Sequence, residues 1–285
     1  IELYCIAEPG KRALILDTGH PDLCGFEALD GVQKTLRIPW SNIEVFLSHF
    51  HDDHDGNLLY CVQKGASKLY SGPTQIDSRT LIDNFLVLSS SADLKSDSAS
   101  SFIRLVAAGK KAQTCTQGSR IELHGGETLS IAGYHFDVLL TPGHTSNHLC
   151  LLDKSKKIFF AGDHICDAPP GCMQYAINDH LVARYLESLA QLKELNLQAV
   201  YMCHHNPLRG SFEINRFISL IEGRYETLVI RARKLFADHE ELTVREAAIV
   251  AAAHYPRGLE GFPVSTQINR IATIFGTLEY LYDLG

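Results

Sequence analysis

Histidines and aspartates are concentrated in one short segment of this sequence. The segment Leu47–Gly56 reads LSHFHDDHDG and places three histidines and three aspartates within seven consecutive positions. Imidazole nitrogens and carboxylate oxygens are the ligands that suit zinc, iron or manganese in sites without thiolates. The pattern His-x-His-x-Asp-His is formed by His49, His51, Asp53 and His54. A divalent ion held by such ligands can activate water.

Three further groups of the same kind follow later apolar segments. His144 stands in TPGHT, Asp163 in AGD, and His205 follows His204 in CHHNP. Each alone is weak evidence, because a single histidine at a strand end is more often a hydrogen-bonded loop residue than a ligand. Together with the first segment they supply seven ligand groups, counting one histidine of the last pair. That number exceeds what one tetrahedral ion needs and suits two ions that share a carboxylate.

The candidate ligands follow segments that read as buried strands. Short apolar runs cover residues 3–7, 13–17, 43–48, 135–141, 148–153, 157–163 and 198–203. The first two form a predicted hairpin across the turn EPGK, and apolar residues at helical spacing predict a helix over about 179–195. Alternating strands and helices indicate α/β layers, in which ligand sites lie beyond strand ends.

Two regions differ from this α/β pattern. Residues 76–114 read as a helical insertion interrupted by a serine-rich stretch, which either caps a cleft or forms a surface excursion. Residues 216–285 read as helices only, and TVRE at 243–246 is a capping box. We therefore predict one domain over 1–215, with the insertion inside it, and a helical C-terminal extension over 216–285.

Composition and charge argue against a nucleic-acid-binding protein and against a membrane protein. The chain of 285 residues has 26 Lys and Arg against 33 Asp and Glu, a net charge of −7 that repels polyanions. The C-terminal extension holds eight basic and nine acidic residues, so it has no excess of cations for nucleic acid. No membrane-length apolar run and no secretory pattern is visible, and eight scattered cysteines form no Cys-x-x-Cys pair. We expect a cytoplasmic protein with a small-molecule substrate and no membrane partner.

Five motifs in order carry a family resemblance. DTG at 17–19, HFHDDH, TPGHT, AGD and CHHNP resemble the metallo-β-lactamase superfamily over roughly residues 1–210. The resemblance implies a four-layer αββα sandwich with a dinuclear metal site between its sheets. The flavodiiron oxygen reductases of this superfamily carry a glutamate at the position of His51. The histidine found here resembles the hydrolytic branch of the superfamily instead.

The resemblance also implies a role for each candidate ligand. His49, His51 and His144 would hold the first metal, Asp53, His54 and His205 the second, and Asp163 would bridge the two. His204 stands where the family usually has a glycine, and Asn206-Pro207 then aligns with Gly-Pro, so His205 is chosen as the last ligand. Asp53 would also be catalytic, by orienting the attacking water.

The implied activity is hydrolysis of a small ester, thioester or lactone by a hydroxide that bridges two divalent ions. Zinc is the expected metal, with iron or manganese as alternatives. The C-terminal helices resemble those of lactamase-like endoribonucleases, so an RNA phosphodiesterase is one alternative. A signalling effector with vestigial activity and a mononuclear-iron thiol dioxygenase are others. A homodimer fits this kind of protein.

Three residues after or near the bridging aspartate are candidates for substrate contact. They are His164, Met173 and Tyr175, all in the segment that follows Asp163. For His164 the competing interpretation is support of the loop, and for Met173 and Tyr175 it is core packing.

Overall fold

The computed structural model describes most of the chain. The described residues are 1–21, 25–73, 120–166, 180–238, 241–252, 258 and 264–284. The predicted insertion at 76–114 and the candidates Met173 and Tyr175 lie outside these ranges.

The first sheet comes from the N-terminal part of the chain and has the order β1-β2-β3-β4-β5. Its strands are β1 (Tyr4–Glu8), β2 (Arg12–Leu16), β3 (Ile43–Phe46), β4 (Lys68–Ser71) and β5 (Arg120–Glu122). β1 and β2 form the predicted antiparallel hairpin, in which Cys5 pairs with Ile15. The strands from β2 to β5 are parallel. The ends of β2 and β3 therefore lie at the same edge of the sheet.

Helices cover the outer face of this sheet. They are α1 (Gly25–Leu36), the 3-10 helix η1 (Trp40–Asn42), the short α2 (Asp52–Asp55) and α3 (Leu58–Lys64). Side chains along a strand alternate between the two faces, so Ala13 and Ile15 of β2 pack with Leu29 of α1 and Leu58 of α3. The α2 helix carries the predicted ligands Asp53 and His54, which places them at the start of the helical layer.

The second sheet has the order β11-β10-β9-β8-β7-β6. Its strands are β6 (Thr128–Ile131), β7 (Tyr134–Leu140), β8 (Leu149–Asp153), β9 (Ile158–Phe160), β10 (Ala199–Tyr201) and β11 (Leu208–Arg209). β9 and β10 are parallel neighbours, and the chain between them includes α6 (Leu181–Glu194), the helix predicted over 179–195. The other neighbouring pairs are antiparallel.

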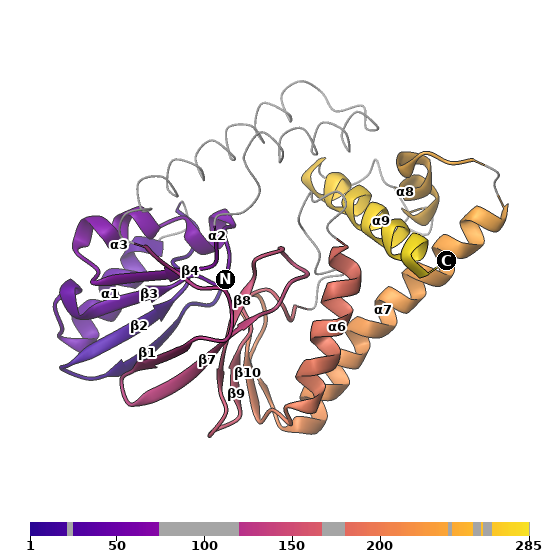
Figure 1. The fold of residues 1–285 in the computed structure, drawn as a ribbon. Helices are drawn as coiled ribbons and strands as arrows, with labels where there is room; N and C mark the ends of the chain where they lie inside the picture. Colours follow the sequence, from indigo (N-terminus) through magenta and orange to yellow (C-terminus); the bar gives the residue numbers. More distant parts are fainter. Residues whose placement is uncertain are drawn as a thin grey trace.

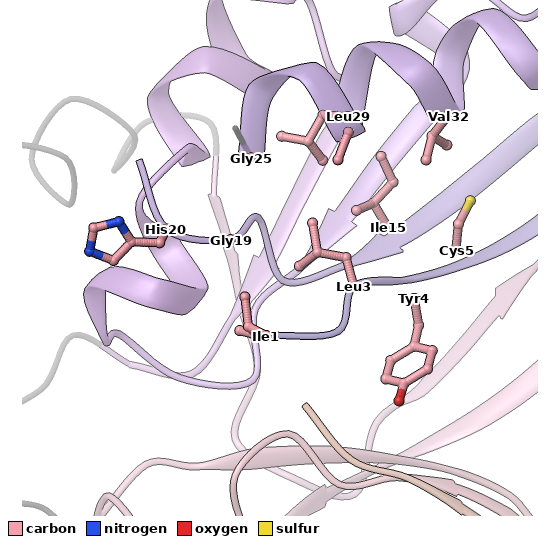
Figure 2. Close-up of a pocket in the computed structure, with 11 residues that line it drawn as sticks. Ile1, Leu3, Tyr4, Cys5, Ile15, Gly19, His20, Gly25, Leu29 and Val32 are labelled. Carbon is pink, nitrogen blue, oxygen red and sulfur yellow. The ribbon is translucent and has the colours of Figure 1, made fainter. Parts of the chain in front are cut away.

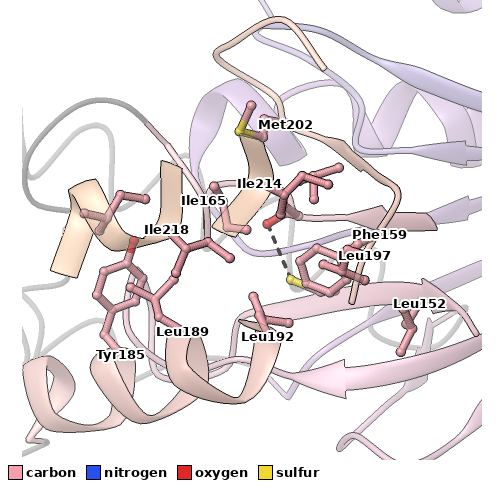
Figure 3. Packing of buried hydrophobic residues seen from close by; sticks show 14 of the residues in the cluster. Leu152, Phe159, Ile165, Tyr185, Leu189, Leu192, Leu197, Met202, Ile214 and Ile218 are labelled. Atoms are coloured by element: carbon pink, nitrogen blue, oxygen red, sulfur yellow. Dashed lines mark hydrogen bonds between the residues drawn. The ribbon is translucent and has the colours of Figure 1, made fainter. Parts of the chain in front are cut away.

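The two sheets pack face to face, with helices outside both of them (Figure 1). Leu14, Leu16 and Phe46 of the first sheet share a core with Phe136 and Leu151 of the second sheet. A separate core joins the second sheet to α6 and the helix that follows β11, and Figure 3 shows Leu189 and Leu192 of α6 within it. The predicted αββα sandwich is thus confirmed.

The C-terminal extension consists of α7 (Ser211–Asp238), α8 (Val244–Ala252) and α9 (Val264–Leu284). The predicted boundary between residues 215 and 216 falls inside α7. Ile214 and Ile218 of α7 belong to the core under the second sheet, whereas Leu235 packs with α8 and α9. The long helix therefore joins the sandwich to the extension without a break. No described helix has the length and apolar character needed to cross a membrane.

Candidate metal centre

Strand directions bring the candidate ligands to one edge of the sandwich. His49 and His51 follow β3 of the first sheet. In the second sheet β7, β9 and β10 run in the same direction, because β8 is antiparallel to both β7 and β9, and β10 is parallel to β9. The segments after these three strands carry His144, Asp163 and His204.

Three imidazoles converge in the first ligand group. The Nε2 atom of His49 lies 2.9 Å from Nδ1 of His51, and Nε2 of His144 lies 3.1 Å from the same Nδ1. Tetrahedral zinc with Zn–N bonds of about 2.0–2.1 Å keeps its ligand nitrogens roughly 3.3 Å apart. The spacing of the three nitrogens therefore fits one shared ion.

A second ligand group consists of Asp53, His54 and His204. Nε2 of His204 lies 3.1 Å from Oδ2 of Asp53. Nε2 of His54 lies 3.7 Å from the same Oδ2. Two imidazoles and one carboxylate of this kind fit a second divalent ion.

Asp163 lies between the two ligand groups. Its Oδ2 is 3.5 Å from Nε2 of His144 in the first group, and 3.3 Å and 3.2 Å from Nε2 of His54 and His204 in the second. Its Oδ1 and the Nε2 of His54 are buried and have no hydrogen-bond partner. A buried polar atom without a partner costs free energy, and a cation held at these atoms would remove that cost. The residues present therefore fit metal ions, with no thiolate among the two groups and Asp163.

The structure corrects the choice of the last ligand. His204, and not His205, joins the second group. The ring of His205 lies against Phe217 of α7 at 5.5 Å between centroids, and its Nδ1 is 3.0 Å from the carbonyl oxygen of Asn206. The chain bends after β10 at residues 203–205, and this bend brings only the first of the two histidines to Asp163. The only signal in the sequence was the pair itself, and the motif alignment selected His205, the member that lies away from Asp53 and Asp163.

Burial keeps two histidines of the first group, His49 and His51, neutral. Burial and the neighbouring His144 lower the pKa of His51 to about 3. Burial, with His54 and His51 nearby, also lowers the pKa of His49 well below its usual range. Both imidazoles can therefore offer a lone pair at neutral pH without first losing a proton.

The residues of the second group are charged in the absence of metal. Hydrogen bonds to Asp163 and Asp53 raise the pKa of His204 to about 9. Burial opposes the ionisation of Asp53, but the hydrogen bond from His204 and the charge of His54 outweigh it and hold the pKa of Asp53 at about 2. Burial likewise opposes the ionisation of Asp163, and the same two histidines keep its pKa well below the usual range. Without a metal, protons on histidine balance these carboxylates.

Asp17 of the DTG motif contacts His54 of the second ligand group and the backbone of Ser48. Its carboxylate accepts the backbone N–H of Ser48 at 2.8 Å and lies 2.9 Å from Nδ1 of His54. Burial lowers the pKa of His54, but the charges of Asp17 and Asp163 outweigh it and raise that pKa well above its usual value. A carboxylate on the far nitrogen of an imidazole fixes the orientation of the ring. The sequence marked Asp17 as part of a motif but gave no sign of this contact.

The loop that carries Asp163 requires a glycine. Gly162 has φ +49, and a Cβ added there would lie 2.7 Å from Cβ of Ser48 and 2.8 Å from Nε2 of His148. The left-handed backbone and the close approach both favour glycine at this position. The loop of the second sheet can therefore lie directly against the loop of the first.

His164 is fully buried beside the candidate ligands. Its Nε2 lies 2.9 Å from Oγ of Ser188 in α6, and its carbonyl oxygen accepts the hydroxyl of Tyr185 at 2.8 Å. Burial and the neighbouring His144 lower its pKa to about 3, so its ring is neutral. This placement favours support of the loop over contact with substrate.

A pocket of about 330 Å³ lies elsewhere, between the start of the chain and α1 (Figure 2). Apolar side chains such as Leu3, Ile15 and Leu29 line it, and Gly19 and His20 lie at its edge. It contains none of the residues of the two ligand groups. The cavity is therefore separate from the candidate metal centre.

Comparisons with known proteins agree with this geometry. The family model described as metallo-beta-lactamase superfamily matches residues 4–204. A metallo-beta-lactamase family protein from Thermus thermophilus is similar in structure at TM-score 0.67 and 19% identity, covering 99% of this chain and 88% of that one. A beta-lactamase domain protein from Burkholderia ambifaria is similar at TM-score 0.70 and 16% identity, covering 99% and 82%.

A third solved structure has a different named activity. The stereoselective inverting sec-alkylsulfatase of a Pseudomonas species is similar at TM-score 0.58 and 17% identity, covering 98% of this chain and 47% of that one. At such identities the structures show a shared fold alone. The family-model match, over more than half of the chain, goes further. This chain therefore belongs to the metallo-beta-lactamase superfamily, whose members are mostly metal-dependent hydrolases that typically bind two metal ions.

Proposed function

We propose that this protein is a dinuclear metal-dependent hydrolase that cleaves a small ester, thioester or lactone. The observation that carries the proposal is the position of Asp163, whose Oδ2 lies within 3.5 Å of histidine nitrogens from both ligand groups. One carboxylate shared by two sets of ligands is the arrangement expected where two ions lie close together. Zinc is the metal we propose, because nitrogen and oxygen ligands at this spacing suit it.

Bound divalent ions lower the pKa of water from 15.7 to about 7 and polarise the oxygen of a carbonyl or phosphoryl group. The chain supplies the rest. Against the effect of burial, Asp53 is held ionised, with its pKa lowered to about 2 by His204 and His54, so its Oδ2 can accept a hydrogen bond from the attacking water and orient it. The side chains of Asp53 and His204 are 30% and 38% exposed, whereas His49 and His54 are buried. Substrate would therefore approach from the side of Asp53 and His204.

The test begins with metal analysis of protein purified without added metal, followed by turnover of thioester, lactone, ester and phosphodiester substrates. Two equivalents of metal with ester, thioester or lactone hydrolysis support the proposal. One iron per chain, oxygen consumption with a persulfide, or cleavage of RNA alone would overturn it and favour the corresponding alternative.

A matched pair of variants tests the role of Asp53. Asp53→Asn should bind less metal and lose most of the turnover, because a neutral amide is a weaker ligand for a divalent ion than a carboxylate. Asp52→Asn changes the adjacent carboxylate, which is 44% exposed and faces His20, and should behave like the unmodified protein. Equal activities of the two variants would contradict the assignment of Asp53.

A further inference from the structure

Three buried polar side chains lie beneath the loop that carries Asp163. They are Thr141, His148 and Cys150, which are 3%, 0% and 0% exposed. Thr141 follows β7, His148 precedes β8, and Cys150 lies in β8. None of the three belongs to either ligand group, yet together they connect to both ends of the segment from Ala161 to Asp163.

The hydrogen bonds at His148 have one consistent direction. The backbone N–H of Asp163 donates to Nε2 of His148 at 3.2 Å, so this nitrogen carries no proton. Full burial favours the neutral imidazole, and a neutral imidazole then holds its proton on Nδ1. Nδ1 lies 3.1 Å from Oγ1 of Thr141 and therefore donates to it.

The hydrogen bonds of Thr141 and Cys150 run in the same order from donor to acceptor. The hydroxyl of Thr141 donates to Sγ of Cys150 at 3.0 Å. Its other acceptor, the carbonyl oxygen of His148, is farther away at 3.4 Å and already accepts the backbone N–H of Thr141 at 2.9 Å. The thiol of Cys150 donates to the carbonyl oxygen of Ala161 at 3.4 Å.

These bonds close a ring. It starts at the N–H of Asp163, passes through the three buried side chains and ends at the carbonyl oxygen of Ala161, two residues earlier. Hydrogen bonds in such a series polarise and strengthen one another. Because Gly162 has a left-handed backbone at φ +49, the ring holds in place a turn that most residues would not adopt.

We propose that His148 is a positioning residue for Asp163, held in its Nδ1-protonated form by Thr141 and Cys150. Through the backbone amide it keeps the carboxylate of Asp163 within reach of both ligand groups. The inference rests on the proposed metal-binding function, because positioning has a consequence only if Asp163 binds metal. The ligand concerned is a divalent cation, tested with zinc.

The first experiment reads the protonation of His148 directly. In metal-free protein labelled with 15N-histidine, proton–nitrogen correlation spectra should show His148 with the proton on Nδ1. Thr141→Val has nearly the same shape but offers no acceptor, so the preference for Nδ1–H should weaken or disappear. Thr141→Ser keeps the hydroxyl and should preserve it. An Nε2–H form in the unmodified protein would overturn the proposal.

The second experiment measures zinc binding by competition with a chelator. His148→Met removes the acceptor for the N–H of Asp163 and should weaken zinc binding by about 10–100-fold, as loss of a ligand's hydrogen-bond partner commonly does. His148→Gln can return an amide oxygen near the position of Nε2 and should restore much of the affinity. Wild-type affinity in His148→Met would overturn the proposal.

The two experiments separate the possible failures. If the unmodified protein binds no zinc, the proposed function fails, and the positioning role fails with it even where the spectra show the predicted tautomer. If it binds zinc and neither His148→Met nor Thr141→Val changes the affinity, only the positioning role fails. If His148→Met does not fold, the comparison of Thr141→Val with Thr141→Ser decides the question.

Discussion

At the scale of single residues, His204 and His205 have entirely different surroundings although they are adjacent in the chain. His204 reaches Asp53 and Asp163 at 3.1 Å and 3.2 Å. His205 packs against Phe217 of α7. The difference arises because the segment after β10 turns one side chain towards the metal centre and the next towards the helical layer. The pair therefore offers a matched test of the ligand assignment.

We expect His204→Ala to lose one equivalent of bound metal together with most of the turnover, because the second ligand group then keeps only one imidazole. His205→Ala should bind both equivalents and stay active. Metal analysis after dialysis and a turnover assay check both variants. Metal loss in His205→Ala without loss in His204→Ala would reverse the assignment.

The two ligand groups also differ in whether their histidines are protonated at pH 7. In the metal-free protein the pKa of His204 is raised to about 9 and that of His54 is raised as well, so both are protonated at pH 7. Metal binding must displace these protons. Affinity for the ion in this group should therefore rise with pH up to about 9 and fall as pH falls. His51, with a pKa of about 3, is already neutral and adds no such dependence.

Calorimetric titration at pH 7 in buffers of different ionisation enthalpy would measure this release. One or two protons should leave the protein with the ion bound by His54 and His204, and the number should decline as pH approaches 9. An uptake of protons, or no release at pH 7, would contradict the assigned charges.

At the scale of elements, the capping box at the start of α8 forms as predicted. The hydroxyl of Thr243 accepts the backbone N–H of Glu246 at 3.2 Å, and the carboxylate of Glu246 accepts the backbone N–H of Thr243 at 2.8 Å. Two donors that the helix start leaves without intrahelical partners are satisfied in this way. The motif belongs to the extension and contacts neither ligand group.

Thr243→Ala should lower the free energy of unfolding by about 1 kcal/mol, within the 0.5–2 kcal/mol usual for loss of an N-cap. Denaturant unfolding followed by circular dichroism measures this change. Thr243→Ser keeps the hydroxyl and is the control. Bound metal and turnover should remain unchanged in both variants, and a loss of metal in Thr243→Ala would mean that α8 supports the metal centre.

At the scale of the whole molecule, the candidate ligands come from both sheets. His49, His51, Asp53 and His54 follow β3 of the first sheet, and His144, Asp163 and His204 follow strands of the second. Ions bound there would hold the two halves of the sandwich together. Metal that binds only the folded state stabilises it, by about 2.7 kcal/mol at a free concentration one hundred times Kd.

Removal of metal with a chelator should therefore lower the Tm of the protein, and zinc should restore it. His51→Ala breaks the first ligand group and should show a much smaller difference between the two conditions. Differential scanning calorimetry measures the Tm of both proteins with chelator and with zinc. An equal chelator effect in both proteins would place the stabilising metal elsewhere.

Much of the fold could be predicted from the sequence because its strands are short apolar runs bounded by turns, and its helices carry regular apolar spacing. The hairpin of β1 and β2, the strand β3 and the helix α6 follow from such local patterns. The motifs also placed six candidate ligands, His49, His51, Asp53, His54, His144 and Asp163, in the two groups or between them. The homodimer and the cytoplasmic location stay predictions.

What only the tertiary structure decided depends on direction and on contacts between distant segments. The direction of a side chain selects His204 over His205, and no residue type encodes it when both neighbours are histidine. The contact of Asp17 with His54 and that of His148 with the loop of Asp163 join residues 37 and 15 positions apart. The sequence by itself determined which residues can bind metal, because their chemistry is local. Packing of the two sheets determined which of them meet, because the candidate ligands lie where loops from both sheets converge.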